Sequence, residues 1–269
     1  MRAARGSDTI VPRCLQNMPP LAIHTVIAKQ MAERLRLPAL DEERGNVYLG
    51  STAPDIRVIT RWDRQRTHFF DIHNFGEQSS ARAFIESNPA ITDAGKLTQR
   101  TQAFLAGYLS HLVVDEGWIG AVYRPFFGER SALGGTLRAN VMDRALQFSL
   151  DADIRSDTDL MAHVLDAVAR CDLDLEIGFI DRESLGRWQE IITEYVQAQP
   201  DWDRFRERAR KHLADTGDST EAGFTELFES LPDLVDEAMR HLSRQRIDDV
   251  MRDSVDASVR VVTEYLACA

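Results

Sequence analysis

The fold of this chain is decided by one stretch of sequence, Ala103-Phe104-Leu105-Ala106-Gly107-Tyr108-Leu109-Ser110-His111-Leu112-Val113-Val114-Asp115. Large and ionisable side chains recur in it every three or four residues, which is the period of an α-helix. One face collects them and continues into the next turn: Phe104, Tyr108, His111, Asp115 and Trp118. The spacing predicts a helix over about residues 97–119 whose inward face carries two ionisable groups.

His111 and Asp115 are four residues apart, so their side chains lie one above the other and can bind one metal ion or two adjacent ones. The alternative is a helix salt bridge worth roughly 0.2–0.5 kcal/mol. The apolar face favours a metal, because burying ionised Asp115 costs several kcal/mol unless a cation compensates it.

The rest of the chain has helical patterns too. Apolar residues from Leu21 to Leu35 recur at helical spacing between Pro19-Pro20 and Pro38, which predicts a first helix. Residues 47–66 predict a short helix that feeds a loop. Later helical patterns cover roughly residues 132–150, 157–171, 182–198, 201–215, 219–242 and 244–267, punctuated by Pro200, Gly217 and Pro232. No β-alternation stands out.

We therefore predict an all-α fold, a helical bundle that forms one domain over residues 18–269. The chemistry is expected mainly in residues 18–127, and the helices of 131–269 are expected to wall the site or pack against a partner. Residues 1–17 are expected to be a flexible extension, with Met18 as an alternative start.

Composition excludes several classes of protein. With 43% apolar residues over 269 positions the chain can bury a sizeable core, so it is not a disordered or fibrous protein. No apolar run approaches the roughly 18 residues of a membrane-spanning helix. A formal charge of -11 argues against sequence-independent nucleic-acid binding.

The cysteines and the N-terminal sequence indicate the compartment. Cys14, Cys171 and Cys268 are odd in number and scattered, so they form neither a disulfide scaffold nor a thiolate metal motif. The basic N-terminus is interrupted before an apolar stretch of signal-peptide length can form. We expect a cytoplasmic protein.

Further ligand-type residues occur before residue 112. His24 lies on the apolar stripe of the first helix, where a histidine can also be a satisfied core residue. Asp55 follows Pro54 and could equally cap a helix. His68 has aromatic neighbours, and Asp71 could orient its second ring nitrogen. His73 could bind a metal, contact a phosphate or sit exposed.

These pieces resemble the zinc-dependent phospholipase C family, which includes secreted bacterial phospholipases C and is related to single-strand nucleases of the same all-α fold. The matching segments, in family order, are Ile23-His24-Thr25, Leu49-Gly50-Ser51-Thr52-Ala53-Pro54-Asp55, Thr67-His68-Phe69-Phe70-Asp71 and Ala103 to Asp115. The resemblance covers roughly residues 18–127, under half of the chain.

The resemblance implies a two-metal site. The ligands of one zinc ion would be Asp55, His68, His111 and Asp115. Asp115 would bridge to a second metal that is also held by His24, and Asp55 would be a candidate general base. The secreted relatives complete the second metal with their own N-terminus, so water, His73 or a substrate oxygen would have to substitute here. The ligands of the relatives' third zinc are absent, because the chain continues Glu116-Gly117-Trp118 after Asp115.

The expected function is metal-dependent hydrolysis of phosphoric esters by a metal-activated water. Two Zn²⁺ per chain are expected, although this donor set also suits Mn²⁺ or Fe²⁺. Guanidinium groups match phosphate geometry, so four arginines are candidate phosphate contacts or simply a solvated face. They are Arg57, Arg61, Arg64 and Arg66.

Two alternatives stay open. One is a non-hydrolytic helical protein of the same ancestry that keeps a structural metal. The other is a metal-dependent enzyme acting on another small metabolite. The expected partner is a small-molecule or lipid phosphoester, with a soluble one slightly preferred, and the amphipathic C-terminal helices could form a homodimer.

Overall fold

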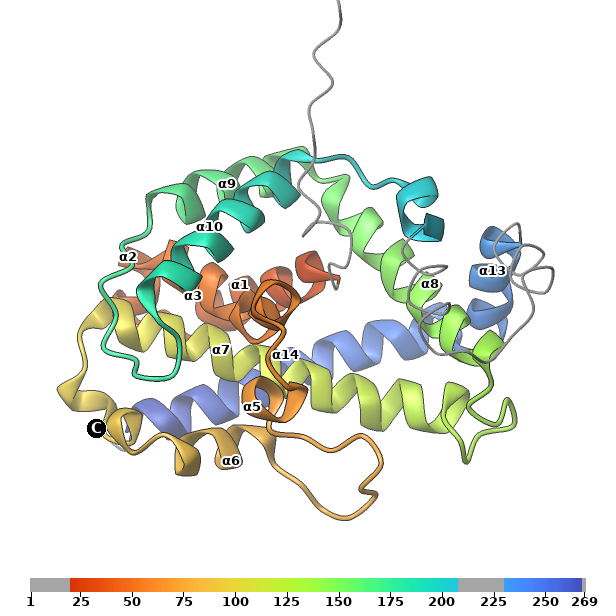
Figure 1. Cartoon of the computed structure of the whole chain (residues 1–269), viewed down its shortest axis with the longest axis horizontal. Helices are drawn as coiled ribbons and strands as arrows, with labels where there is room; N and C mark the ends of the chain where they lie inside the picture. Colours follow the sequence, from red (N-terminus) through yellow and green to blue (C-terminus); the bar gives the residue numbers. More distant parts are fainter. Residues whose placement is uncertain (1–19, 208–229, 268–269) are drawn as a thin grey trace, which may run out of the picture.

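The structure is a computed structural model that describes residues 20–207 and 230–267 (Figure 1). Every regular element in these two ranges is a helix, which confirms the all-α prediction. The elements are α1 (Leu21–Leu35), α2 (Pro38–Glu42), α3 (Arg44–Thr52), η2 (Ala53–Ile56), α4 (Arg57–Thr60), α5 (Arg64–His68), α6 (Ser80–Ser87), η3 (Pro89–Ile91), η4 (Ala94–Lys96), α7 (Gln99–Trp118), η5 (Ile119–Phe127), α8 (Leu137–Arg155), α9 (Thr158–Arg170), α10 (Arg182–Gln197), α13 (Leu231–Leu242) and α14 (Arg244–Ala267).

Most helix boundaries follow the sequence pattern. The helix predicted over residues 97–119 is α7, and it continues as a π-helix, η5. Residues 47–66 hold more helix than expected, because α3, η2, α4 and α5 follow one another there. The helix predicted over 201–215 is described only as far as residue 207, and that over 219–242 only from residue 230. Pro232 lies in the first turn of α13, where its missing N–H is tolerated, rather than ending a helix.

Helix α7 crosses the centre of the molecule, with α14 beside it and α1 and α3 packed on it (Figure 1). Helices α9 and α10 form one pair, and α8 packs with α13. None of the helices in the described ranges combines the length and apolar character that crossing a bilayer requires.

Two glycines let α3 and α7 touch backbone to backbone. A Cβ atom on Gly50 would lie 2.0 Å from the Phe104 carbonyl oxygen, and one on Gly107 would lie 2.1 Å from the Val47 carbonyl oxygen. No larger residue fits either position without moving a helix. This close crossing brings the end of α3 and the following η2 against the His111 side of α7.

An extended segment, residues 171–181, joins α9 to α10. Its side chains alternate between the interior and the solvent. The inward set is Leu173, Leu175, Ile177 and Phe179, and the outward set is Asp172, Asp174 and Glu176. This period-two pattern was not identified from the sequence, and the segment forms no strand, in agreement with the all-α prediction.

Candidate metal centre

Four elements bring five ligand-type side chains to one place beneath the surface. α1 supplies His24, η2 supplies Asp55, α5 supplies His68, and α7 supplies both His111 and Asp115. The first four are buried, whereas the Asp115 side chain is 25% exposed. The cluster is therefore closed on the protein side and reachable from solvent at Asp115.

The donor atoms of His68 and His111 face the two carboxylates at short range. The His68 Nε2 atom lies 3.4 Å from Asp55 Oδ1 and 3.5 Å from Asp115 Oδ2. The His111 Nε2 atom lies 3.9 Å from Asp55 Oδ2 and 3.4 Å from His68 Nε2. One group of potential ligands therefore consists of Asp55, His68 and His111.

His24 approaches the other side of Asp115. Its Nε2 atom lies 3.6 Å from Asp115 Oδ1, and its ring stacks on that of His111 with centroids 3.8 Å apart. A second group of potential ligands is therefore His24, His111 and Asp115. Within the described ranges these two are the groups whose donor atoms converge, and a third zinc-type group is not among them.

Hydrogen bonds determine which ring nitrogens are free. The Nδ1 atom of His111 lies 2.8 Å from the Ser51 carbonyl oxygen, an acceptor, so Nδ1 carries the proton and Nε2 is bare. The Nδ1 atom of His68 lies 2.8 Å from the Thr67 hydroxyl, which has the Arg64 carbonyl oxygen as its own acceptor at 3.4 Å. When the Thr67 hydroxyl donates to Arg64 it accepts from His68 Nδ1, and His68 then presents a bare Nε2 to a metal; without a metal, Nε2 can instead carry the proton and donate to Asp55.

The resulting arrangement fits a divalent cation. Two imidazole lone pairs 3.4 Å apart repel each other unless a cation or a proton lies between them. Neutral imidazoles and carboxylates are the nitrogen and oxygen donors that zinc binds, with the second nitrogen held by an acceptor. The Asp55, His68 and His111 group meets each of these conditions.

The second group is less complete. His111 has only one free nitrogen, so it can serve one metal and not both groups at once. A second metal would then retain His24 and Asp115 from this chain. The buried Nδ1 atom of His24 has no hydrogen-bond partner, so its ring is less firmly oriented than the other two.

Charge compensation inside the cluster favours ionised carboxylates. Burial alone would raise the pKa of Asp115, but the Arg64 guanidinium 2.5 Å away and the nearby imidazoles lower it further than burial raises it. Burial likewise opposes ionisation of Asp55, whereas a hydrogen bond from the His68 ring and the positive charge of a protonated imidazole bring its net pKa below the usual value in the metal-free protein. Burial lowers the pKa of His111, which keeps this imidazole neutral.

Acid should destabilise the metal-free protein through His24. Burial and the neighbouring His111 lower the pKa of His24 from 6.5 to about 4. The unfolded chain therefore binds this proton more tightly, and stability falls as pH drops from 6.5 towards 4. From pH 7 to pH 4, chelator-treated wild type should lose up to ~3 kcal/mol more unfolding free energy than His24→Gln. Urea unfolding of both proteins at pH 7 and pH 4 measures this difference. An equal loss of unfolding free energy in wild type and His24→Gln would contradict the prediction.

The structure distinguishes between alternatives that the sequence left open for Asp71, Asp55 and His73. Thr67, not Asp71, contacts the second nitrogen of His68, while Asp71 accepts from the His73 backbone N–H. Asp55 does not cap a helix, since its carboxylate faces the imidazoles. The His73 side chain is 80% exposed and lies 3.7 Å from Glu129, outside both ligand groups.

The four arginines separate into different environments. Arg64 contacts Asp115 at the open side of the cluster. Arg66 lies two residues before His68 on α5, so it points to the opposite side, and its guanidinium stacks 3.8 Å from the Trp62 ring. Arg57 is half-buried and Arg61 is exposed. Only Arg64 is brought to the candidate ligands.

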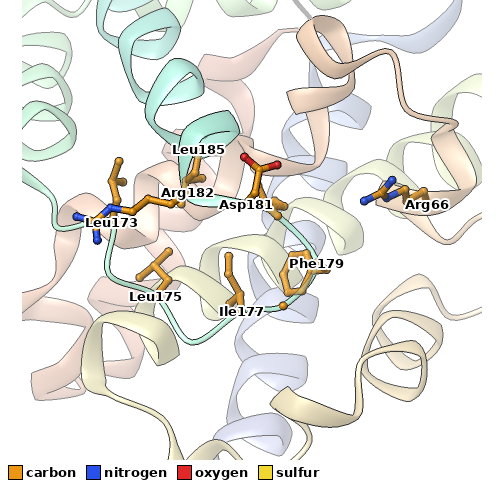
Figure 2. Close-up of a pocket in the computed structure, with 10 residues that line it drawn as sticks. Arg66, Leu173, Leu175, Ile177, Phe179, Asp181, Arg182 and Leu185 are labelled. Atoms are coloured by element: carbon orange, nitrogen blue, oxygen red, sulfur yellow. The ribbon is translucent and has the colours of Figure 1, made fainter.

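Arg66 instead faces a groove of about 370 Å³ beside the extended segment (Figure 2). Apolar side chains of that segment and of α10 form its wall, with Phe179 and Asp181 on the side facing Arg66. The wall includes Leu173, Leu175, Ile177, Ile180 and Leu185. The groove and the metal centre thus lie on different sides of α5.

Comparison with known proteins finds one family. Residues 23–116 match the model of the family described as zinc dependent phospholipase C, which confirms the resemblance over less than half of the chain. All five candidate ligands fall inside the matched segment. No curated protein and no solved structure matches the chain.

Proposed function

We propose that this protein is a metal-dependent hydrolase of phosphoric esters whose centre is built by Asp55, His68, His111, Asp115 and His24. The observation that carries the proposal is the convergence of the Nε2 atoms of His68 and His111 on the carboxylates of Asp55 and Asp115. A helix salt bridge between His111 and Asp115 would need neither His68 nor Asp55 at that point. The family match over residues 23–116 supports the same class of reaction.

Zinc is the proposed metal, and Mn²⁺ or Fe²⁺ suits the same donors. The tighter position is Asp55, His68 and His111, with Asp115 at its edge 3.5 Å from His68. The weaker position is His24 with Asp115, completed by water or a substrate oxygen. His73 is not part of this proposal, because its exposed ring pairs with Glu129.

A bound divalent cation supplies Lewis acidity and lowers the pKa of a coordinated water towards neutrality. The chain contributes orientation and charge. Asp55, ionised and buried, can accept a proton next to the reacting water. Arg64 stands at the solvent-accessible edge with Asp115, where a guanidinium can contact a phosphoryl oxygen in the geometry that phosphate favours.

The proposed substrate is a small-molecule or lipid phosphoester that enters from the Asp115 side. The net charge of -11 disfavours docking on an anionic membrane surface, so a soluble phosphoester is our first choice. The incomplete second position favours one alternative, a protein of the same ancestry that retains a single structural metal without turnover.

Metal titration tests the proposal directly. Chelator-washed protein should bind one zinc ion tightly and a second more weakly, and a generic phosphodiester should be hydrolysed only after both are restored. Elemental analysis, equilibrium dialysis and product release measure the three quantities. One tight zinc ion without hydrolysis would favour the structural alternative, and a protein that binds no zinc, manganese or iron would refute both.

A further inference from the structure

Two buried hydroxyl groups connect His68 to the helix that carries His111. The Tyr108 hydroxyl donates to the Thr67 carbonyl oxygen at 2.8 Å, and the Thr67 hydroxyl lies 2.8 Å from His68 Nδ1. We propose that Thr67 and Tyr108 are positioning residues that hold the His68 imidazole at the correct distance from His111 for metal binding. This inference rests on the proposed metal centre.

Helix α5 needs such a support at its C-terminal end. It has only five residues, and the last carbonyl groups of a helix have no partner within it. The next residue, Phe69, has a φ of 53°, a left-handed conformation that is unfavourable for a residue with a Cβ. Tyr108 satisfies one of these carbonyl groups and fastens the end of α5 to α7.

The Tyr108 ring is itself fixed by its surroundings. It is 1% exposed and stacks on Phe84 with centroids 4.4 Å apart, and Phe179 meets it edge-on at 5.4 Å. Tyr108 precedes His111 by three residues and shares its face of α7. A hydroxyl that cannot move relative to His111 therefore sets the position of the backbone that carries His68.

Thr67 completes the support at the imidazole. Its hydroxyl can accept from His68 Nδ1 while donating to the Arg64 carbonyl oxygen, which fixes both the ring orientation and the tautomer. Thr67 is 2% exposed, so water does not replace the hydroxyl if it is lost. Without it, either nitrogen of His68 could carry the proton and the ring could rotate.

The test compares variants that remove one hydroxyl each. Thr67→Val keeps the shape of the side chain, Thr67→Ser keeps the hydroxyl, and Tyr108→Phe removes only the phenolic oxygen. Zinc affinity is measured by competition with a chelating dye, and the absorption spectrum of bound Co²⁺ reports the ligand geometry. Thr67→Val and Tyr108→Phe should weaken tight zinc binding about 10–100-fold and alter the Co²⁺ spectrum. Thr67→Ser should restore both to near wild type.

A matched control separates positioning from general stability. The Tyr265 hydroxyl also donates to a buried carbonyl oxygen, that of Ile91 at 2.6 Å, but it joins α14 to η3, which carry no candidate ligand. Tyr265→Phe should lower thermal stability as Tyr108→Phe does and leave zinc affinity unchanged. The inference is overturned if Thr67→Val and Tyr108→Phe keep wild-type affinity and spectrum, or if Tyr265→Phe weakens zinc binding equally. If wild type binds no metal, the proposed function fails as well, and this is seen before any variant is made.

Discussion

Replacing Gly107 by alanine should lower the free energy of unfolding by at least about 2 kcal/mol and remove tight metal binding. The new Cβ would lie 2.1 Å from the Val47 carbonyl oxygen and 2.7 Å from the Ser51 nitrogen, so α3 and α7 would have to separate. Separation would pull the Ser51 carbonyl from His111 and Asp55 from both imidazoles. Gly50→Ala should act in the same way from the α3 side.

Urea unfolding and zinc content measure these two effects. Gly120→Ala is the matched control, because a Cβ there meets nothing within 4 Å and the position is an exposed one on the continuation of the same helix. It should leave stability unchanged or raise it by up to about 1 kcal/mol, because alanine favours the helix more than glycine does, and it should leave zinc content unchanged. Wild-type stability in Gly107→Ala would show that the two helices do not touch as described.

Replacing His111 by asparagine should lower zinc affinity at the tight position by more than about 100-fold. Mutating even a hydrogen-bond partner of a metal ligand typically lowers metal affinity by about 10–100-fold, and the loss of a ligand should cost more. Asparagine keeps an amide near the position of Nδ1 that can donate to Ser51, so the helix contact survives while Nε2 is lost. The thermal stabilisation that zinc gives the wild type should disappear with it, because a ligand stabilises only the folded state that binds it.

Zinc affinity and melting temperature with and without zinc measure this result. His241→Asn is the control, since His241 is exposed on α13 and belongs to neither ligand group. It should keep the wild-type metal content and the zinc-dependent rise in melting temperature. A His111→Asn protein that retained both would show that the metal is held elsewhere or that His111 is only a core residue.

The pattern of the α7 sequence was enough to predict a helix and to place His111 and Asp115 on its inward face. Helical period is a local property, and an ionisable residue on an apolar stripe is visible without any tertiary contact. The resemblance of four short segments added Asp55, His68 and His24, and the structure brings these residues together. Which of them bind metal stays a prediction.

Other features could not be read from the sequence because they depend on contacts between distant positions. Asp71 is the carboxylate closest to His68 in the sequence, yet the Thr67 hydroxyl is the group that contacts the His68 ring. The His73 side chain is left in solvent. That Arg64 rather than Arg66 reaches Asp115 depends on which side of α5 faces α7, and the hydroxyl of Tyr108 finds its acceptor 41 residues away.

The sequence by itself thus determined the helical fold class and a set of candidate metal ligands, because periodicity and donor chemistry belong to each segment. Only the tertiary structure decided that Gly50 meets the backbone of Phe104 and Gly107 that of Val47, that His111 has a single nitrogen free for a metal, and which groups orient His68. These outcomes depend on how closely two helices approach each other and on how each helix is rotated about its own axis. The close packing of the whole core determines the distance and the rotation.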